Sequence, residues 1–262
     1  ALFENLSHVV AQSEIDGQRF AELGARPVTV SGNLKVDTTP PPANQQEFEN
    51  LKASIAGRPV WAAVSTHDGE EDIAGDVHNL VESRHAGLLT IIVPRHPDRA
   101  PAIVSLLKAK GLNVARRSAG EAITDETQVY LGDTIGEMGL YLRLTEIAFV
   151  GRSLTSTGGQ NPLEPAALET AVLAGPNVQN FRDSYKRLID DGNARLVKDK
   201  EMLAAGVSYL LGNEPVRRKM MEAGVAAVTA MQGSLAKTMA TLEPYIQPLV
   251  VKAGLDRLTG KR

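Results

Sequence analysis

Short apolar runs alternate with helical patterns along most of this 262-residue chain, and this alternation restricts the fold more than any other feature. The runs with the length and composition of buried strands are 60–64, 88–93, 113–116, 129–131, 147–150, 172–174 and 195–197. Strands that alternate with helices indicate βαβ units, in which helices cover both faces of a parallel sheet. We therefore predict an α/β fold with a Rossmann-like, doubly wound parallel sheet.

Composition agrees with this class and excludes several functions. Hydrophobic residues make up 43% of the chain and aromatic residues only 4%, which is typical of parallel sheets packed on helices. The net charge of −3 gives no basic surface for nucleic acid. The chain has no cysteine, so disulfides and thiolate metal sites are excluded. No apolar stretch approaches the ~18 residues of a membrane span, and we expect a soluble chain.

A proline-rich segment at 38–43 interrupts the alternation and predicts a stiff extended connector. Before it, Ser13 opens a helix that Gly24 ends, and a short strand follows at 28–30. After it, Asn44 caps a helix that Gly57 ends.

Near the C-terminus we expect a helix over 235–245 that ends at Pro244. An exposed apolar face is expected beyond it, formed by Leu249, Val250, Val251 and Leu255.

Polar loops follow four of the predicted strands, at 65–71, 94–99, 132–137 and 158–165. In a doubly wound sheet, ligands bind beyond the carboxyl ends of the strands, where loops lead into helices. All four loops are therefore expected at one edge of the sheet, as parts of one ligand site.

The loop at 158–165 reads GGQNPLEP. A glycine pair lets backbone amides approach a bound group, and Pro162 fits the first position of a helix whose unpaired N–H groups attract an anion. Glu164 then lies beside that anion, where a carboxylate suits the hydroxyls of a ribose. The same residues also form a capping box that needs no ligand, with Asn161 as the cap.

Arg95 follows the most apolar run, where its guanidinium suits a phosphate or a carboxylate. Its alternative is an ion pair with Glu70 or Glu137. His67 is more typical of a hydrogen-bonding loop residue than of a metal ligand, because no other His or Cys lies at ligand spacing.

Five motifs in order resemble those of the 3-deoxy-D-manno-octulosonic acid (Kdo) transferases of lipopolysaccharide biosynthesis. They are SGNLK at 31–35, STHDGEE at 65–71, PRHP at 94–97, GDTIGEM at 132–138 and GGQNPLEP at 158–165. The resemblance runs over nearly the whole chain. It implies the GT-B architecture, in which two Rossmann-like domains bind ligands in the cleft between them.

The resemblance implies that residues 37–245 form the C-terminal, CMP-sugar-binding domain of a glycosyltransferase. Residues 1–36 would be the end of the N-terminal acceptor domain and the start of the linker, and 246–262 a C-terminal tail or crossover helix. The implied reaction transfers Kdo from CMP-Kdo to the lipid A precursor with inversion, at the cytoplasmic face of the inner membrane. The general base would lie in an N-terminal domain that precedes this chain, so the chain alone is expected to bind CMP or CMP-Kdo without turnover.

The implied donor-binding residues follow the motifs. Glu164 would bind the ribose hydroxyls, Asn161 and the Gly159 amide would face the phosphate or sugar, and Arg95 would neutralise the phosphate or the Kdo carboxylate. The remaining implied site residues are Lys35, Thr66, His67, His96, Thr134, Glu137 and Ser153. No cofactor is expected, and with no Asp-x-Asp site at a strand end we predict a metal-independent site.

Two departures from the family pattern concern the last polar loop. Arg152 stands where the family usually has glycine, and Gln160 stands where it usually has histidine. Two other functions remain open, a UDP-sugar epimerase-like protein of the same architecture and a non-catalytic interaction module. The first would prefer UDP to CMP, and the second would bind no nucleotide.

Overall fold

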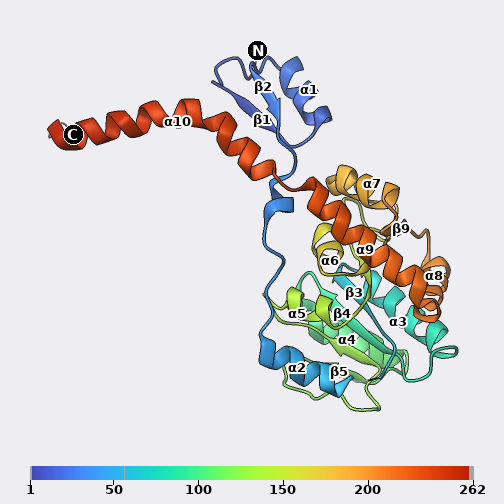
Figure 1. Cartoon of the computed structure of the whole chain (residues 1–262). Coiled ribbons are helices and arrows are strands. Elements are labelled where there is room, and N and C mark those ends of the chain that lie inside the picture. The colour runs from blue at the N-terminus through green and yellow to red at the C-terminus, as the bar shows by residue number, and fades with distance from the viewer. Residues whose placement is uncertain (1, 56, 260–262) are drawn as a thin grey trace. The chain divides into compact units, whose positions relative to one another are not determined.

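The computed structural model describes residues 2–55 and 57–259, with the backbone alone described from residue 252 onward. These residues group into two compact units (Figure 1). The end unit comprises residues 1–39 and 229–262, and the sheet unit comprises residues 40–228. The domain boundaries expected at 36/37 and 245/246 stay predictions.

The end unit contains a small βαβ arrangement. Strand β1 (Val9–Ala11) pairs in parallel with β2 (Val28–Val30), and α1 (Glu14–Glu22) connects them. The Ser13 hydroxyl accepts the backbone N–H of Asp16 at the helix start, and Gly24 follows the helix with a left-handed φ of 96°. The predicted helix and strand are confirmed.

Two segments far apart in the sequence meet within the end unit. The 3-10 helix η1 (Leu34–Asp37) contacts α10 (Ser234–Thr259). The Asp37 carboxylate accepts the backbone N–H groups of Gly233 at 2.7 Å and Leu235 at 2.5 Å. An aspartate from elsewhere in the chain therefore caps the start of α10.

The helix end expected at Pro244 is wrong, because α10 continues past both Pro244 and Pro248. Each proline removes one helical N–H, but the helix is exposed there and water can bind the carbonyls that lose their partners. The apolar face expected after it is confirmed for Leu249, Val250 and Val251, which are 57–66% exposed. The side chain of Leu255 lies outside the described residues.

The sheet unit is built on seven parallel strands in the order β5-β6-β4-β3-β7-β8-β9, which confirms the doubly wound prediction. Their bounds differ from the predicted ones by at most two residues at either end. They are β3 (Val60–Thr66), β4 (Leu89–Pro94), β5 (Val114–Arg116), β6 (Val129–Leu131), β7 (Ile147–Val150), β8 (Ala171–Ala174) and β9 (Ala194–Leu196).

Helices cover both faces of this sheet (Figure 1). Apolar residues of α3, α4 and α8 share one buried cluster with Trp61, Ile92 and Phe149 of the sheet. Contacts of α5 with β3 and β4, of α6 with β8 and of α7 with β9 cover the other face. The bounds are α2 (Gln45–Ser54), α3 (Glu70–Glu82), α4 (Ala100–Ala109), α5 (Met138–Arg143), α6 (Leu163–Ala167), α7 (Arg182–Asp190), α8 (Lys200–Gly212) and α9 (Glu214–Met231), with 3-10 helices η2 (Pro97–Arg99) and η3 (Gln179–Phe181).

The connector at 38–43 begins directly after η1 and contains no helix or strand, as predicted. Pro41 contributes its carbonyl to Arg143 of α5 at 2.7 Å. Among the described residues, no helix combines the length and apolar character needed to cross a membrane.

The strand order locates the crevice where ligands bind in such sheets. The chain passes from β3 to β4 on one side and later returns to place β7 on the other side of β3. The direction of winding therefore switches between β3 and β7, and in such sheets the ligand crevice lies beyond the carboxyl ends of the two strands at the switch.

Candidate functional site

The end of β3 departs from regular geometry at this crevice. Its register with β4 shifts between Val64 and Thr66, and Ser65 adopts a left-handed φ of 54°. Non-glycine residues in this conformation carry strain, which often accompanies functional loops. The bulge turns the chain toward His67 and the start of α3.

Glu70 joins the loop after β3 to the loop after β7. Its carboxylate is buried, at 1% exposure, and accepts the backbone N–H of His67 at 2.9 Å. It also accepts three consecutive backbone N–H groups, those of Arg152 at 2.6 Å, Ser153 at 2.9 Å and Leu154 at 3.0 Å. A carboxylate that accepts four amide donors is satisfied without a cationic partner.

Thr66 lies beside this bridge, and its side chain is buried. The Thr66 hydroxyl donates to Glu71 at 2.9 Å, and Arg99 donates to both oxygens of Glu71 at 2.7 and 3.1 Å. The side chain of Thr66 therefore supports the loop from inside.

Arg95 and His96 follow β4, and both are exposed. The Arg95 backbone N–H donates to the carbonyl of Thr66 at 3.0 Å, which fastens this loop to the neighbouring one. The rings of His67 and His96 meet edge to face with centroids 5.6 Å apart. These contacts place His67, Arg95 and His96 together at the carboxyl edge.

The ion pairs considered for Arg95 do not form. Glu70 is occupied by backbone amides, and Glu137 is held by Arg117 at 2.7 and 3.1 Å. Within the described part of the chain, the Arg95 guanidinium has no hydrogen-bond or ion-pair partner. An exposed guanidinium without a carboxylate partner is available to a ligand anion.

Thr134 and Glu137 follow β6 and form one cluster with Arg117 and Tyr141. The hydroxyl of Thr134 donates to Glu137, and that of Tyr141 lies 3.3 Å from the same carboxylate. The hydrogen bonds from Arg117 lower the pKa of Glu137, and burial opposes them only in part. Glu137 is therefore ionised at neutral pH and already paired.

The glycine pair after β7 has the conformation that the sequence predicts. Gly158 and Gly159 have φ angles of 117° and 74°, which a side chain would strain. The Gly159 N–H donates to the Arg152 carbonyl at 2.9 Å, so the loop folds back on itself. The Gly159 amide is thus bonded within the loop.

Arg152 and Ser153 stand at the base of the same loop. Arg152 adopts a φ of 55°, a conformation that favours glycine, and its Nε donates to the Thr157 carbonyl at 3.1 Å. Ser153 is completely buried, and its hydroxyl donates to the Val150 carbonyl and accepts the Gly175 N–H. The Ser153 side chain therefore ties the loops after β7 and β8 together.

The alternative considered for Asn161, a capping box, forms only in part, and helix α6 begins at Leu163 and has only five residues. Asn161 Oδ1 accepts the N–H of Leu163 at 3.1 Å, and the Asn161 side-chain amide donates to Glu164 Oε1 at 3.1 Å. Pro162 occupies the cap position itself, which shifts the helix start by one residue. So short a helix contributes little dipole to an anion.

Lys35 lies in η1 of the end unit, with an exposed side chain, and its place at the cleft stays a prediction. In the described residues no three side chains among His, Cys, Asp and Glu gather in a way that would hold a metal ion.

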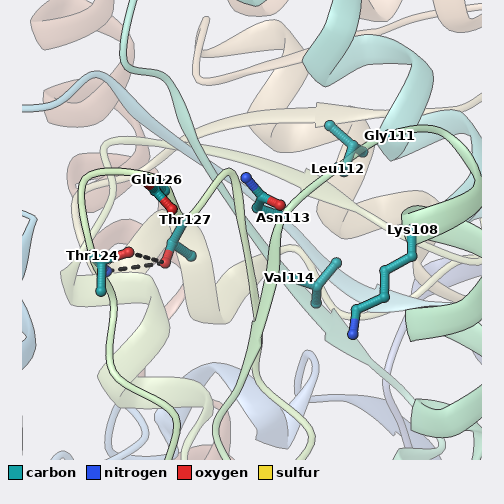
Figure 2. Close-up of a pocket in the computed structure, with 8 residues that line it drawn as sticks. All are labelled: Lys108, Gly111, Leu112, Asn113, Val114, Thr124, Glu126 and Thr127. Carbon is teal, nitrogen blue, oxygen red and sulfur yellow. Dashed lines mark hydrogen bonds between the residues drawn. The ribbon is translucent and has the colours of Figure 1, made fainter.

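Two cavities of the sheet unit lie away from the candidate residues. One has a volume of about 500 Å³ and lies beside the amino ends of β5 and β6. Lys108, Asn113 and Glu126 are among the residues that line it (Figure 2). A second, of about 650 Å³, lies at the amino ends of β3 and β7. Both lie at the sheet edge opposite the carboxyl ends of the strands.

Sequence reasoning missed two residues that organise the site. Glu70 was considered as an ion-pair partner of Arg95, whereas its carboxylate accepts a backbone N–H from a loop 82 residues away. Arg117 carries no motif, yet it joins Glu137 to Glu47 of α2. The sequence signals for Glu70 were the acidic pair at 70–71 and its place in the STHDGEE motif at 65–71.

Known proteins resemble this chain over most of its length. A family model described as 3-Deoxy-D-manno-octulosonic-acid transferase (kdotransferase) matches residues 1–38. The 3-deoxy-D-manno-octulosonic acid transferase of Haemophilus influenzae is 33% identical over 250 residues, which are 94% of this chain and 58% of that protein. The transferase of the same description from Bordetella pertussis is 36% identical over 245 residues, 92% of this chain and 57% of that protein.

One solved structure combines fold and sequence similarity. The C-terminal CMP-Kdo binding domain of WaaA from Acinetobacter baumannii is 29% identical, with a TM-score of 0.63, and the match covers 71% of this chain and 96% of that one. The chain spans less than three fifths of the length of the two curated relatives.

Proposed function

We propose that this chain, which belongs to the family of 3-deoxy-D-manno-octulosonic acid (Kdo) transferases, binds the sugar nucleotide CMP-Kdo at the carboxyl edge of its sheet. It would be the donor-binding part of a glycosyltransferase that moves Kdo onto the lipid A precursor. The similarity to a CMP-Kdo binding domain supports CMP-Kdo as the ligand. The polar loops gathered at the carboxyl edge of the sheet support this edge as the binding place.

One observation carries this proposal: the Arg95 guanidinium is exposed beyond the carboxyl end of β4, while the two carboxylates considered as its partners, Glu70 and Glu137, are satisfied by other donors. A positive group left without a protein partner suits the phosphate of CMP or the carboxylate of Kdo.

The chemistry of transfer gives Arg95 its role. Negative charge grows on the CMP phosphate as its bond to the sugar breaks, and a fixed guanidinium stabilises that charge. The acceptor hydroxyl attacks the opposite face of the anomeric carbon, which gives inversion. We propose that the site works without a divalent metal, because the guanidinium supplies the positive charge.

Glu164 would accept hydrogen bonds from the ribose hydroxyls of the sugar nucleotide through Oε2, because Oε1 already accepts one from the Asn161 side-chain amide. Asn161 fixes the orientation of that carboxylate, and Gly158 and Gly159 allow the loop to approach the phosphate or sugar closely. His67 and His96 would line the pocket beside Arg95.

Transfer also requires a base within about 3 Å of the acceptor hydroxyl. We propose that a preceding N-terminal domain of the parent protein supplies it, together with the contacts to lipid A at the cytoplasmic face of the inner membrane. This chain alone would bind CMP-Kdo without turnover.

Isothermal titration of the folded chain with CMP tests the proposal. CMP is expected to bind, and UMP or UDP to bind more weakly. A preference for UDP would favour an epimerase-like function, and no heat at millimolar CMP would overturn the nucleotide assignment in favour of an interaction module. Added acceptor should give no product with this chain and should give product with the full reading frame.

A further inference from the structure

Three consecutive backbone amides point at one carboxylate that lies buried between the loops after β3 and β7. Those of Arg152, Ser153 and Leu154 lie 2.6–3.0 Å from the oxygens of Glu70. Successive N–H groups arranged in this way form a nest, which in other proteins binds phosphate and similar anions. In this chain the nest is filled by a side chain of the protein itself.

The surroundings fix this arrangement closely. A Cβ added at Gly151 would lie 2.7 Å from Glu70 Oε2 and 2.5 Å from the Ser65 carbonyl, so only glycine fits before the nest. The left-handed φ of Arg152 turns the next amides toward the carboxylate. Because Glu70 is 1% exposed, water cannot replace it without rearrangement.

We infer that Glu70 is a positioning residue, a built-in anion that fills the nest at 152–154 and thereby holds the loop up to Gly159 in its ligand-binding conformation. The inference rests on the proposed function and deepens it. With its nest filled, this loop cannot receive the donor's phosphate through those amides, so the phosphate falls to Arg95 in the loop after β4.

The loop is continuous with the residues assigned to the ligand. The Arg152 carbonyl accepts the Gly159 N–H at 2.9 Å, and the Gly158 carbonyl accepts the Asn180 N–H at 2.8 Å. A displacement at Arg152 therefore moves the glycine pair, which lies two residues before Asn161. Glu70 acts on the site through these bonds without touching the ligand.

The test compares Glu70→Gln, Glu70→Ala and the unchanged chain by CMP titration and by hydrogen exchange of the amides at 152–154. Glu70→Gln keeps the volume and one acceptor oxygen, so it serves if the alanine variant does not fold. We expect Glu70→Ala to weaken CMP binding by about tenfold or more and to speed exchange of the three amides. The CMP affinity and the amide exchange rates of Glu70→Gln should lie between those of the unchanged chain and those of Glu70→Ala. Added formate, which has the missing carboxylate's chemistry, should slow exchange again and restore CMP binding to Glu70→Ala.

Asn193→Ala is the matched control for a general loss of stability. Asn193 is fully buried and donates to the carbonyls of Thr170 and Met220, away from the crevice. It should lower the unfolding temperature and leave CMP affinity unchanged. If Asn193→Ala weakens CMP as much as the Glu70 variants do, the positioning role is wrong.

The outcomes separate the two proposals. Failure of the unchanged chain to bind CMP would remove the proposed function, while amide exchange and formate would still report on the nest. Normal CMP binding by the chain and by folded Glu70 variants would overturn the positioning role alone. Loss of binding that formate does not restore would show that Glu70 is not acting as a replaceable anion.

Discussion

The side-chain amide of Asn161 donates to Oε1 of Glu164 at 3.1 Å, so the carboxylate assigned to the ribose is oriented before any ligand arrives. An acceptor that is already fixed loses little side-chain entropy on binding. This relationship makes the contribution of Glu164 measurable with nucleotides that differ in one hydroxyl.

Glu164→Ala should weaken CMP by about tenfold or more, because hydrogen bonds to charged groups contribute roughly 1.5–3 kcal/mol. The affinity for deoxy-CMP, which lacks one ribose hydroxyl, should fall less than the affinity for CMP in this variant. Titration calorimetry with both nucleotides measures the difference. Glu222→Ala, on the exposed surface of α9, is the control and should change neither affinity. Equal weakening of the two nucleotides would remove the ribose role from Glu164.

Arg95→Ala should weaken CMP by about tenfold and leave cytidine almost unchanged, because only CMP carries the phosphate. The CMP affinity of the unchanged chain should also fall with added salt more steeply than that of the variant. Arg84→Ala removes an equally exposed arginine just beyond the end of α3 and should have no effect. Similar losses for cytidine and CMP would contradict a phosphate contact.

Arg152→Gly should leave the free energy of unfolding unchanged or raise it by up to about 1 kcal/mol. Glycine adopts the φ of 55° without strain, which offsets the lost bond from Arg152 Nε to Thr157. Arg152→Ala keeps the strain and loses the bond, so it should be less stable than both. Urea unfolding of the three chains gives the order, and a glycine variant less stable than the alanine variant would refute the backbone argument.

Acidification below pH 6.5 should destabilise the fold through His78. Burial lowers the pKa of His78 from its ordinary value of 6.5, and the ring is completely buried beside Thr90. The unfolded chain therefore takes up a proton near pH 6.5 that the folded chain does not. Stability is present above that pH and is lost as the pH falls below it, by up to about 1.4 kcal/mol per pH unit.

Urea unfolding between pH 7.5 and about pH 5 measures this slope. The variant His78→Gln should show a flatter dependence of stability on pH. The variant Thr90→Val should be less stable but keep the same dependence, because the histidine stays buried. Glu137 and Asp76 have lowered pKa values, so their stabilising contribution is lost only at lower pH. The loss begins as the pH falls below the ordinary pKa values, 4.5 for Glu137 and 3.8 for Asp76. A slope unchanged in His78→Gln would assign the acid sensitivity to another group.

The sheet was predictable because its strands are buried on both faces and therefore read as uninterrupted apolar runs. The loops were predictable as a set because parallel strands place all their carboxyl ends at one edge. Local signals also located the caps at Ser13 and Asn44, whose side chains each bond to a backbone N–H three residues on.

Contacts between distant segments were not predictable in the same way. Glu70 reads as an acidic residue in a first helical turn, and nothing in the sequence shows that its partners are amides 82–84 residues away. Thr66 and Ser153 were expected to face a ligand, but side-chain direction depends on the bulge at Ser65 and on the Gly175 loop. Pro244 was read by its local preference, whereas an exposed helix tolerated it.

Asp37 and Gly233 are joined although 196 positions separate them, and this has a consequence for how the molecule is made. During synthesis, the whole seven-stranded sheet emerges before the residues that Asp37 must grip. The 3-10 helix η1, which follows the strand pair β1–β2, therefore lacks its contact with α10 until residue 233 and those after it have been made. If the chain were cut anywhere between residues 40 and 228 and then unfolded, the two parts of the end unit would have to associate as separate molecules on refolding.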